Sequence, residues 1–331
     1  MNIKPLPARP NLEQYRKQAK DLVKKTGSKL ADAQFTLARE HGFDSWPKFA
    51  KHIEALARKT SPISKFEQAA EAIIAGDAAT LTRLLRENPK LIRARSTRVH
   101  RATLLHYIAA NGFEDYRQKT PTNAVEIAKI LLDAGAEVDA ISDSYGGKDT
   151  TLVLVATSIH PKRAGVQIAL LQLLLDHSAV ADGVNPCLRN GRPEAAEFLA
   201  QHGAPLDLEA AAGLGRLELV QKLIGEGTST QINCGLWWAS EYGRNSVIDF
   251  LLDHGADLRA GEQTALPALH WAIVGGQLET VKLLLKRGAS LEAKNQYGGT
   301  ALGQAHWCVA NADSGFDYAP IVKLLVDADA K

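Results

Sequence analysis

The stretch LHWAIVGGQLETVKLLLKRGASLEA, from Leu269 to Ala293, decides the fold of this chain. Two short segments with apolar residues at helical spacing meet at a pair of glycines, and the second segment closes on Gly288 and Ala289. The same frame fits LLHYIAANG (104–112) with LLDAGA (131–136), and LWWASEYGR (236–244) with LLDHGA (251–256). A fixed module that recurs along a chain predicts stacked helical pairs.

Eight units follow when the first apolar position of each inner helix is aligned: Ala69, Leu105, Leu152, Val184, Leu208, Leu236, Leu269 and Leu302. The connection from one outer helix to the next aligned position is 13 residues long after Ala256, which is enough for a projecting turn. It shrinks to 5 residues after Ala179 and to 4 after Ala204. The projecting turns, or fingers, are therefore expected to be partly missing in the middle of the array.

These modules resemble ankyrin repeats, whose pattern is a β-turn finger, an inner helix that opens with TPLHxAA, a tight turn and an outer helix that ends LLxxGA. The resemblance covers the chain from Phe66 onward. It implies an all-α fold, an ankyrin-repeat solenoid of about eight helix pairs. His106 and His270 match the position where the family places a structural histidine, whereas the middle units carry Asn185, Glu209 and Trp237 there.

A separate helical segment precedes the array. NLEQYRKQAKDLVKK has apolar residues at helical spacing with Asn11 as its cap, a second helix is expected over Leu30–His41, and Ser45 is expected to cap a third. DAQFTLAREHGFDSWPKF (32–49) is similar to a segment that precedes ankyrin arrays in bacterial proteins. We therefore expect a small helical bundle over residues 1–60, a repeat array over residues 61–331 and a bacterial origin.

The composition limits the class of partner. A formal net charge of +2 at pH 7 gives no general attraction to nucleic acid or to an anionic membrane. No apolar run has the length of a membrane span, and the first residues lack the apolar core of a signal peptide, so a cytoplasmic protein is expected. Cys187, Cys234 and Cys308 have no metal-type spacing, and we predict neither a metal nor a cofactor.

Three insertions are expected at the turns between paired helices, near Asp115–Ala124, His160–Gly165 and Ala310–Pro320. Long loops on a rigid scaffold often carry binding residues, although surface insertions without a function are also common. Tyr116 and Arg117 in the first insertion are candidates for an anion-binding lip; the alternative is a solvated basic loop.

The family frame places the fifth and sixth residues after each aligned position on the concave face. This nominates Asn111, Arg189, Tyr242 and Trp307 as binding residues. His306 stands in the last unit where a small alanine is usual, so it joins Trp307 as a candidate wall of a hollow; an atypical terminal repeat is the alternative.

Glu209 and Glu241 come from neighbouring units and are the candidate catalytic residues if the chain is an enzyme. Two carboxylates beside Arg189 would suit acid and base catalysis on a sugar-like substrate, with Trp237 as a stacking platform. The alternative is structural: Glu209 stabilises a helix N-terminus by its charge, and Glu241 forms an ordinary ion pair.

Two functions remain open at this point. The first is a recognition protein that binds a partner through the concave face of the array. The second is a small-molecule-binding protein or enzyme with a pocket at the finger-less central units, lined by residues such as Asn185, Trp237 and Tyr242. Recognition of a protein predicts exposed apolar residues at the finger tips. The small, polar composition of QYGG (296–299) and SYGGKD (144–149) favours the pocket instead.

Overall fold

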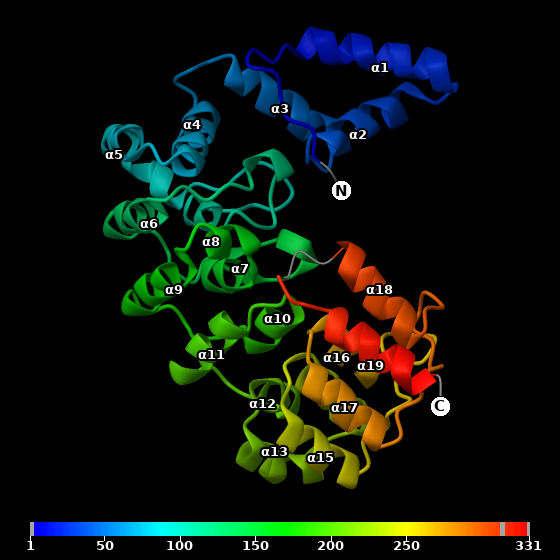
Figure 1. The fold of residues 1–331 in the computed structure, drawn as a ribbon. Coiled ribbons are helices and arrows are strands. Elements are labelled where there is room, and N and C mark those ends of the chain that lie inside the picture. Colours follow the sequence, from blue (N-terminus) through cyan, green and yellow to red (C-terminus); the bar gives the residue numbers. More distant parts are fainter. Residues whose placement is uncertain (1–2, 312–314, 330–331) are drawn as a thin grey trace. The chain divides into compact units, whose positions relative to one another are not determined.

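The computed structural model describes residues 3–311 and 315–329. The chain forms two compact units, Met1–Gly183 and Val184–Lys331, which are coloured from blue to green and from green to red in Figure 1. The first unit holds the N-terminal helices together with the first repeats. The predicted domain boundary at residue 60 is a different division of the chain, and it stays a prediction.

Three helices form the N-terminal bundle: α1 (Leu12–Thr26), α2 (Leu30–Glu40) and α3 (Trp46–Leu56). The Asn11 side chain accepts a hydrogen bond from the Glu13 amide at 2.8 Å, as expected for the cap of α1. Ser45 occupies the expected N-cap position of α3, but its side chain makes no capping hydrogen bond. Aromatic rings fill the bundle, with Phe43 and Phe49 fully buried.

Helical pairs of the first unit follow the predicted frame. The pairs are α4 (Pro62–Ala75) with α5 (Ala78–Glu87), the 3-10 turn η2 (Leu105–Ala109) with α6 (Ala124–Asp133), and α7 (Thr151–Thr157) with α9 (Gln167–Asp176). Shorter elements connect them: η1 (Pro89–Arg93), η3 (Asp115–Arg117) and α8 (Ile159–Arg163). Inner elements contact inner elements in sequence, from α4 to η2 to α7, and outer helices do the same from α5 to α6 to α9.

Five further pairs build the second unit. They are α10 (Val184–Arg189) with α11 (Pro193–Gln201), α12 (Leu208–Leu214) with α13 (Leu217–Leu223) and the turn η5 (Ile224–Glu226), α14 (Ser229–Glu241) with α15 (Asn245–Asp253), α16 (Ala268–Val274) with α17 (Leu278–Lys286), and α18 (Ala301–Asn311) with α19 (Ala319–Asp329). The inner helices contact one another in order, from α10 to α18. Within the described residues the eight predicted pairs are therefore present.

Fingers differ along the chain as the spacing predicts. One is a two-stranded antiparallel hairpin of β1 (Ile141–Ser142) and β2 (Asp149–Thr150), joined by η4 (Ser144–Gly146). The connections from α9 to α10, from α11 to α12 and from η5 to α14 are short and contain no strand among the described residues. A turn-rich finger returns between α15 and α16 and again between α17 and α18.

Small residues allow the inner helices of the second unit to approach closely. A Cβ atom added to Gly275 would lie 1.9 Å from the Glu241 carbonyl oxygen, and one added to Gly235 would lie 3.2 Å from the Ala212 Cβ. The end of α14 thus packs directly on the backbone at the end of α16. Apolar side chains of α12, α14, α16 and α18 form one continuous core along this row.

The three predicted insertions take different forms. The first contains η3 and then an irregular stretch up to α6, and the second is mostly the short helix α8. The third, Ala310–Pro320, lies partly outside the described residues.

A candidate binding groove above a buried charge cluster

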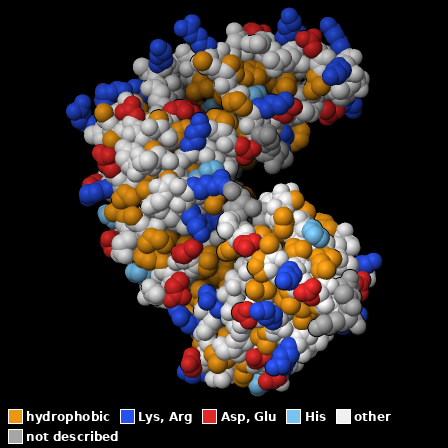
Figure 2. Space-filling model, in the orientation of Figure 1, with side chains coloured by type: hydrophobic (Ala, Val, Ile, Leu, Met, Phe, Trp, Pro, Cys, Tyr) orange, Lys and Arg blue, Asp and Glu red, His pale blue; other side chains and the backbone are white. Residues whose placement is uncertain are grey.

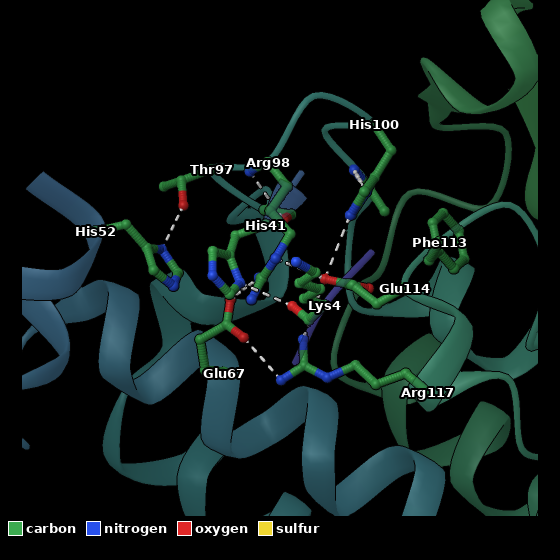
Figure 3. Close-up of polar contacts among 12 residues, drawn as sticks. Lys4, His41, His52, Glu67, Thr97, Arg98, His100, Phe113, Glu114 and Arg117 are labelled. Atoms are coloured by element: carbon green, nitrogen blue, oxygen red, sulfur yellow. Dashed lines mark hydrogen bonds and ion pairs between the residues drawn. The ribbon is translucent and has the colours of Figure 1, made fainter. Parts of the chain in front are cut away.

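Four charged side chains of the first unit are buried together: Glu67, Arg98, Glu114 and Arg117, here called the charge cluster. Burial of an ionised group without a partner carries a large desolvation cost, so such a group needs an opposite charge and hydrogen bonds. In Figure 3, Arg98 enters from above and Arg117 from the right, and each guanidinium meets carboxylates. The two positive and two negative charges compensate one another.

Arg98 lies in the loop between η1 and η2 and joins two carboxylates. Its Nη1 atom lies 2.7 Å from Glu67 Oε1, and its Nε atom lies 3.0 Å from Glu114 Oε1. The guanidinium also lies over the Phe43 ring of the bundle, 5.6 Å from its centroid. One side chain therefore links α4, the first insertion and the N-terminal bundle.

Arg117, in η3, contacts the same carboxylates from the other side. Its Nη2 atom lies 2.7 Å from Glu67 Oε2 and 2.6 Å from Glu71 Oε1, and its Nη1 atom lies 3.3 Å from Glu114 Oε1. The guanidinium is packed between the rings of Tyr107 and Tyr116. These contacts fix the insertion against the helix α4.

Backbone contacts place the Arg98 loop on the bundle. The Val99 amide donates to the Gly42 carbonyl at 3.0 Å, and the His52 Nδ1 atom lies 2.7 Å from the Thr97 hydroxyl. Gly42 has a φ of +81°, which favours glycine and lets the turn after α2 close against this loop. The N-terminal segment contacts the end of α2 next to this turn, because the Lys4 carbonyl lies 2.9 Å from His41 Nδ1.

Burial and neighbouring charges shift the pKa values of the buried carboxyls in opposite directions. Burial raises the pKa of Glu67, but the charges of Arg98 and Arg117 outweigh it and hold that pKa at about 2. Burial lowers the pKa of His52 to about 4, so this imidazole is neutral near pH 7. The carboxylates of the cluster remain ionised under ordinary conditions, with the arginines as their counter-charges.

A groove of about 830 Å³ opens above the charge cluster. Its lining comes from the prolines and leucine of the segment Leu6–Pro10, from residues of α4, and from Tyr116 and Arg117. Glu67, Arg98 and Arg117 reach its base from the buried cluster. A volume of this size lies within the range typical of ligand-binding clefts. We call this space the N-terminal groove.

Among the residues predicted for the first unit, Tyr116 and Arg117 line the N-terminal groove together. Arg117 is almost fully buried and paired with carboxylates, so it is not the solvated basic residue of the alternative interpretation. Asn111 forms its hydrogen bonds with other residues. Its side chain accepts a hydrogen bond from the Tyr145 hydroxyl and donates one to the Thr157 hydroxyl.

Two of the residues predicted for the central units, Arg189 and Glu209, contact each other. Arg189 Nη2 lies 3.7 Å from Glu209 Oε2, and burial raises the pKa of Glu209. Asn185 instead donates to Asp207, and it is Asp207 that caps α12 by accepting from the Ala210 amide. The structural alternative for Glu209, a charge in the first turn of a helix, agrees with its position in α12.

Glu241 ends α14 next to Tyr242. Burial raises the pKa of Glu241 to about 7, and its Oε2 atom has no hydrogen-bond partner. The Tyr242 hydroxyl donates to the Leu188 carbonyl. Trp237 packs against Gly261 of the following finger.

Within the described residues no hydrogen bond or ion pair joins Glu209 to Glu241, and their pairing as catalytic groups stays a prediction.

His306 and Trp307 are both exposed on α18. The exposed fraction of Trp307 is 58%, an unusual value for so large an aromatic ring. Tyr318 is buried and donates to the Val274 carbonyl, so it supports the end of α16.

Sequence reasoning missed most of the charge cluster. Glu67 lies in α4 between two residues of the apolar helical pattern, where a glutamate side chain usually faces solvent. Glu114 directly precedes the first insertion. One signal was available: Arg98, His100 and Arg101 stand in the first finger, where the family pattern has small polar residues. Their carboxylate partners are 14 or more residues away in sequence, which no periodicity reveals.

Comparison with known proteins identifies the repeats. Residues 208–295 and 236–331 match the model of the family described as ankyrin repeats (3 copies). The chain therefore contains ankyrin repeats, and its fold is an all-α ankyrin-repeat solenoid. The helix pairs of the first unit continue the same order of elements toward the N-terminus.

Curated relatives share parts of the chain. It is 30% identical over 188 residues to the ankyrin repeat and KH domain-containing protein mask-1 of Caenorhabditis elegans, which is 51% of this chain and 7% of that protein. It is 33% identical over 118 residues to the ankyrin repeat domain-containing protein SAT10 of Stachybotrys chartarum, which is 36% of this chain and 6% of that protein. The chain thus spans only a small part of these relatives.

The human ASB11 ankyrin repeat domain is a solved structure with 22% sequence identity. The match covers 78% of this chain and 96% of that chain, with a TM-score of 0.41.

Across residues 3–311 and 315–329 the structure contains no helix with the length and apolar character needed to span a membrane.

Replacement of Arg98 by methionine should destabilise the first unit strongly. The change leaves the buried Glu67 and Glu114 without one of their counter-charges, and the loss of one partner of a buried pair costs about 3–5 kcal/mol. Urea unfolding of the full chain measures the effect. Arg93→Met is the matched control, since Arg93 is exposed and lies 3.9 Å from Glu137, and it should change stability by less than about 1 kcal/mol. Equal effects of the two substitutions would contradict the role of the cluster.

Replacement of Glu241 by glutamine should stabilise the chain increasingly with pH. The folded-state pKa of about 7 lies above the ordinary value of 4.5, so the folded state binds the extra proton and stability falls as pH rises between these values. The substitution removes that loss, and its benefit should grow by roughly 2–3 kcal/mol between pH 5 and pH 8. Denaturant unfolding at both pH values measures it, with the exposed Glu226→Gln as control. A benefit independent of pH would show that burial does not shift this carboxyl.

Proposed function

We propose that this chain is a recognition protein, which binds a partner protein through its finger tips and inner helices. Ankyrin repeats form rigid stacked surfaces of this kind, and their extended faces suit contacts spread over several repeats. The proposal rests on the placement of exposed aromatic side chains, because the fold by itself does not define a function.

The observation that carries the proposal concerns four aromatic residues. Tyr145 is 73% exposed in the β1–β2 finger, and Tyr297 is 82% exposed in the finger before α18. Trp307 on the inner helix α18 and Phe316 in the following insertion are each more than half exposed. In the described part of the repeats, the exposed large hydrophobic side chains on outer helices are aliphatic, such as Ile168 and Val326. Tyrosine and tryptophan are enriched at protein interfaces and among the residues that dominate binding energy.

The exposed tyrosine rings change what the composition of the fingers indicates about the kind of partner. The segments SYGGKD and QYGG are mostly small and polar, which favoured a small-molecule pocket, yet each presents one tyrosine to solvent at its tip. Figure 2 shows hydrophobic side chains mixed with charged ones over the visible surface of each unit. A mixed surface with isolated aromatic anchors suits a protein partner better than an enclosed substrate site.

Two finer points belong to the same proposal. The similarity of residues 32–49 to segments that precede bacterial arrays supports a bacterial origin, and a cytoplasmic location is part of the same proposal. The curated relatives named above are eukaryotic, so the bacterial origin depends on the N-terminal segment alone.

Site-specific photo-crosslinking tests the proposed face. A benzoylphenylalanine is placed at Tyr145, Tyr297 or Trp307 of the full chain, in cells that naturally express the protein. Because a partner would lie on the finger tips and inner helices, these positions should yield a discrete protein adduct.

The matched controls carry the crosslinker on outer helices, at the exposed positions Arg86, Gln201 and Lys286. These should yield no such adduct. Adducts that arise mainly from the outer helices, or none from the finger and inner-helix positions, would contradict the proposed function.

A further inference from the structure

The N-terminal groove has unlike charges at its two ends. Lys59, at the end of α3, and Lys65, in the first turn of α4, line one end. Asp77, directly after α4, lines the other end. The groove therefore runs beside α4 from a basic corner to an acidic corner.

The charges at the basic corner are free to meet a ligand. Among the described residues no ion pair engages Lys59 or Lys65. The α4 helix begins beside them, with Ser61 as its cap, and the positive end of its dipole adds to the potential there. An incoming carboxylate would meet two ammonium groups and a helix N-terminus in one place.

The charged side chains in the middle of the groove are paired with one another. Glu71 and Glu67 accept from Arg117, and Arg98 also pairs with Glu67. Between the two corners Ala72 and Ala75 of α4 and the segment Leu6–Pro10 supply apolar lining beside the polar Gln68. Small uncharged side chains of a ligand would fit this stretch without a desolvation cost.

Asp77 is exposed at the opposite corner. Its Oδ1 atom accepts from the Thr80 amide at 2.9 Å, and hydrogen bonds from the Thr80 side chain and amide lower the pKa of this carboxyl, so it carries its negative charge. The C-terminal end of α4 at Gly76 and the N-terminal end of α5, which Asp77 caps, place opposite helix-dipole ends here, so the charge of this corner comes from the Asp77 carboxylate. A lysine or arginine side chain of a ligand would be favoured here and disfavoured at the other end.

We propose that the N-terminal groove binds an extended segment of a partner protein, with an acidic residue at the α3–α4 corner and a basic residue at the α4–α5 corner. The inference rests on the proposed function and names the chemistry of one of its contacts. Lys65 and Asp77 are 12 residues apart along a helix, or roughly 18 Å at 1.5 Å per residue. An extended chain covers that length with about five or six residues.

Selection from a random heptapeptide library on the immobilised full chain tests the proposal. Enriched peptides should carry an aspartate or glutamate separated from a lysine or arginine by four to six positions. The Lys59→Glu/Lys65→Glu double variant should lose binding of these peptides by at least tenfold, because it reverses the charge of one corner. The same charge change at Lys17 and Lys20 of α1, outside the groove, is the matched control and should leave binding unchanged.

A second pair of variants tests the groove without altering charge. Ala75→Trp should block the groove and abolish binding of the selected peptides, whereas Ala79→Trp, on the exposed side of α5, should not. Thermal unfolding confirms that each variant is folded. Enrichment of peptides without the paired charges, no enrichment, or equal binding by the charge-reversed variant would each overturn the proposal.

The two proposals fail in different ways. If selected peptides bind but are insensitive to the groove variants, or if none is selected while the finger positions still crosslink a partner, the groove assignment is wrong and the recognition function stands. If the finger and inner-helix positions yield no adduct, the proposed recognition function is contradicted, whether or not peptides bind the groove.

Discussion

Arg98 and Arg117 carry positive charge into a part of the first unit that water hardly reaches, and neither can be buried unless Glu67 and Glu114 are in place. This requirement links three segments that are remote in sequence: α4, the first finger and the first insertion. Contacts of the same finger with Gly42 and His52 extend the link to the N-terminal bundle. The bundle and the first repeats therefore form one compact unit, and the N-terminal groove lies where they meet.

The second unit is stabilised differently. Its inner helices approach through small residues such as Gly235 and Gly275, and apolar side chains form an unbroken row from α12 to α18. An isolated helical pair could not bury its apolar stripe, so each pair depends on its neighbours. Glu241 is an exception within this row, since it is a carboxyl at a packed helix end, and burial raises its pKa by more than the Tyr242 side chain lowers it.

Much of the fold could be predicted from the sequence because repeats encode it locally. The eight aligned positions, from Ala69 to Leu302, all lie in the first helix of a pair, and the short connections after Ala179 and Ala204 contain no strand among the described residues. The charge cluster could not be predicted, since its pairs join residues of unrelated local patterns. Arg117 was nominated for binding from its insertion alone, and its burial depends on Glu67, a residue 50 positions away.

The central claim is that the charge cluster holds the bundle, the first finger and the first insertion together as one cooperative part. Hydrogen exchange of the full chain, compared between the native protein and Arg98→Met, tests it most directly. We predict that amides of α2, α3, α4 and residues 113–123 lose protection together, because they open as one part when the cluster is broken. Loss of protection confined to the finger at residues 94–103 would contradict the claim.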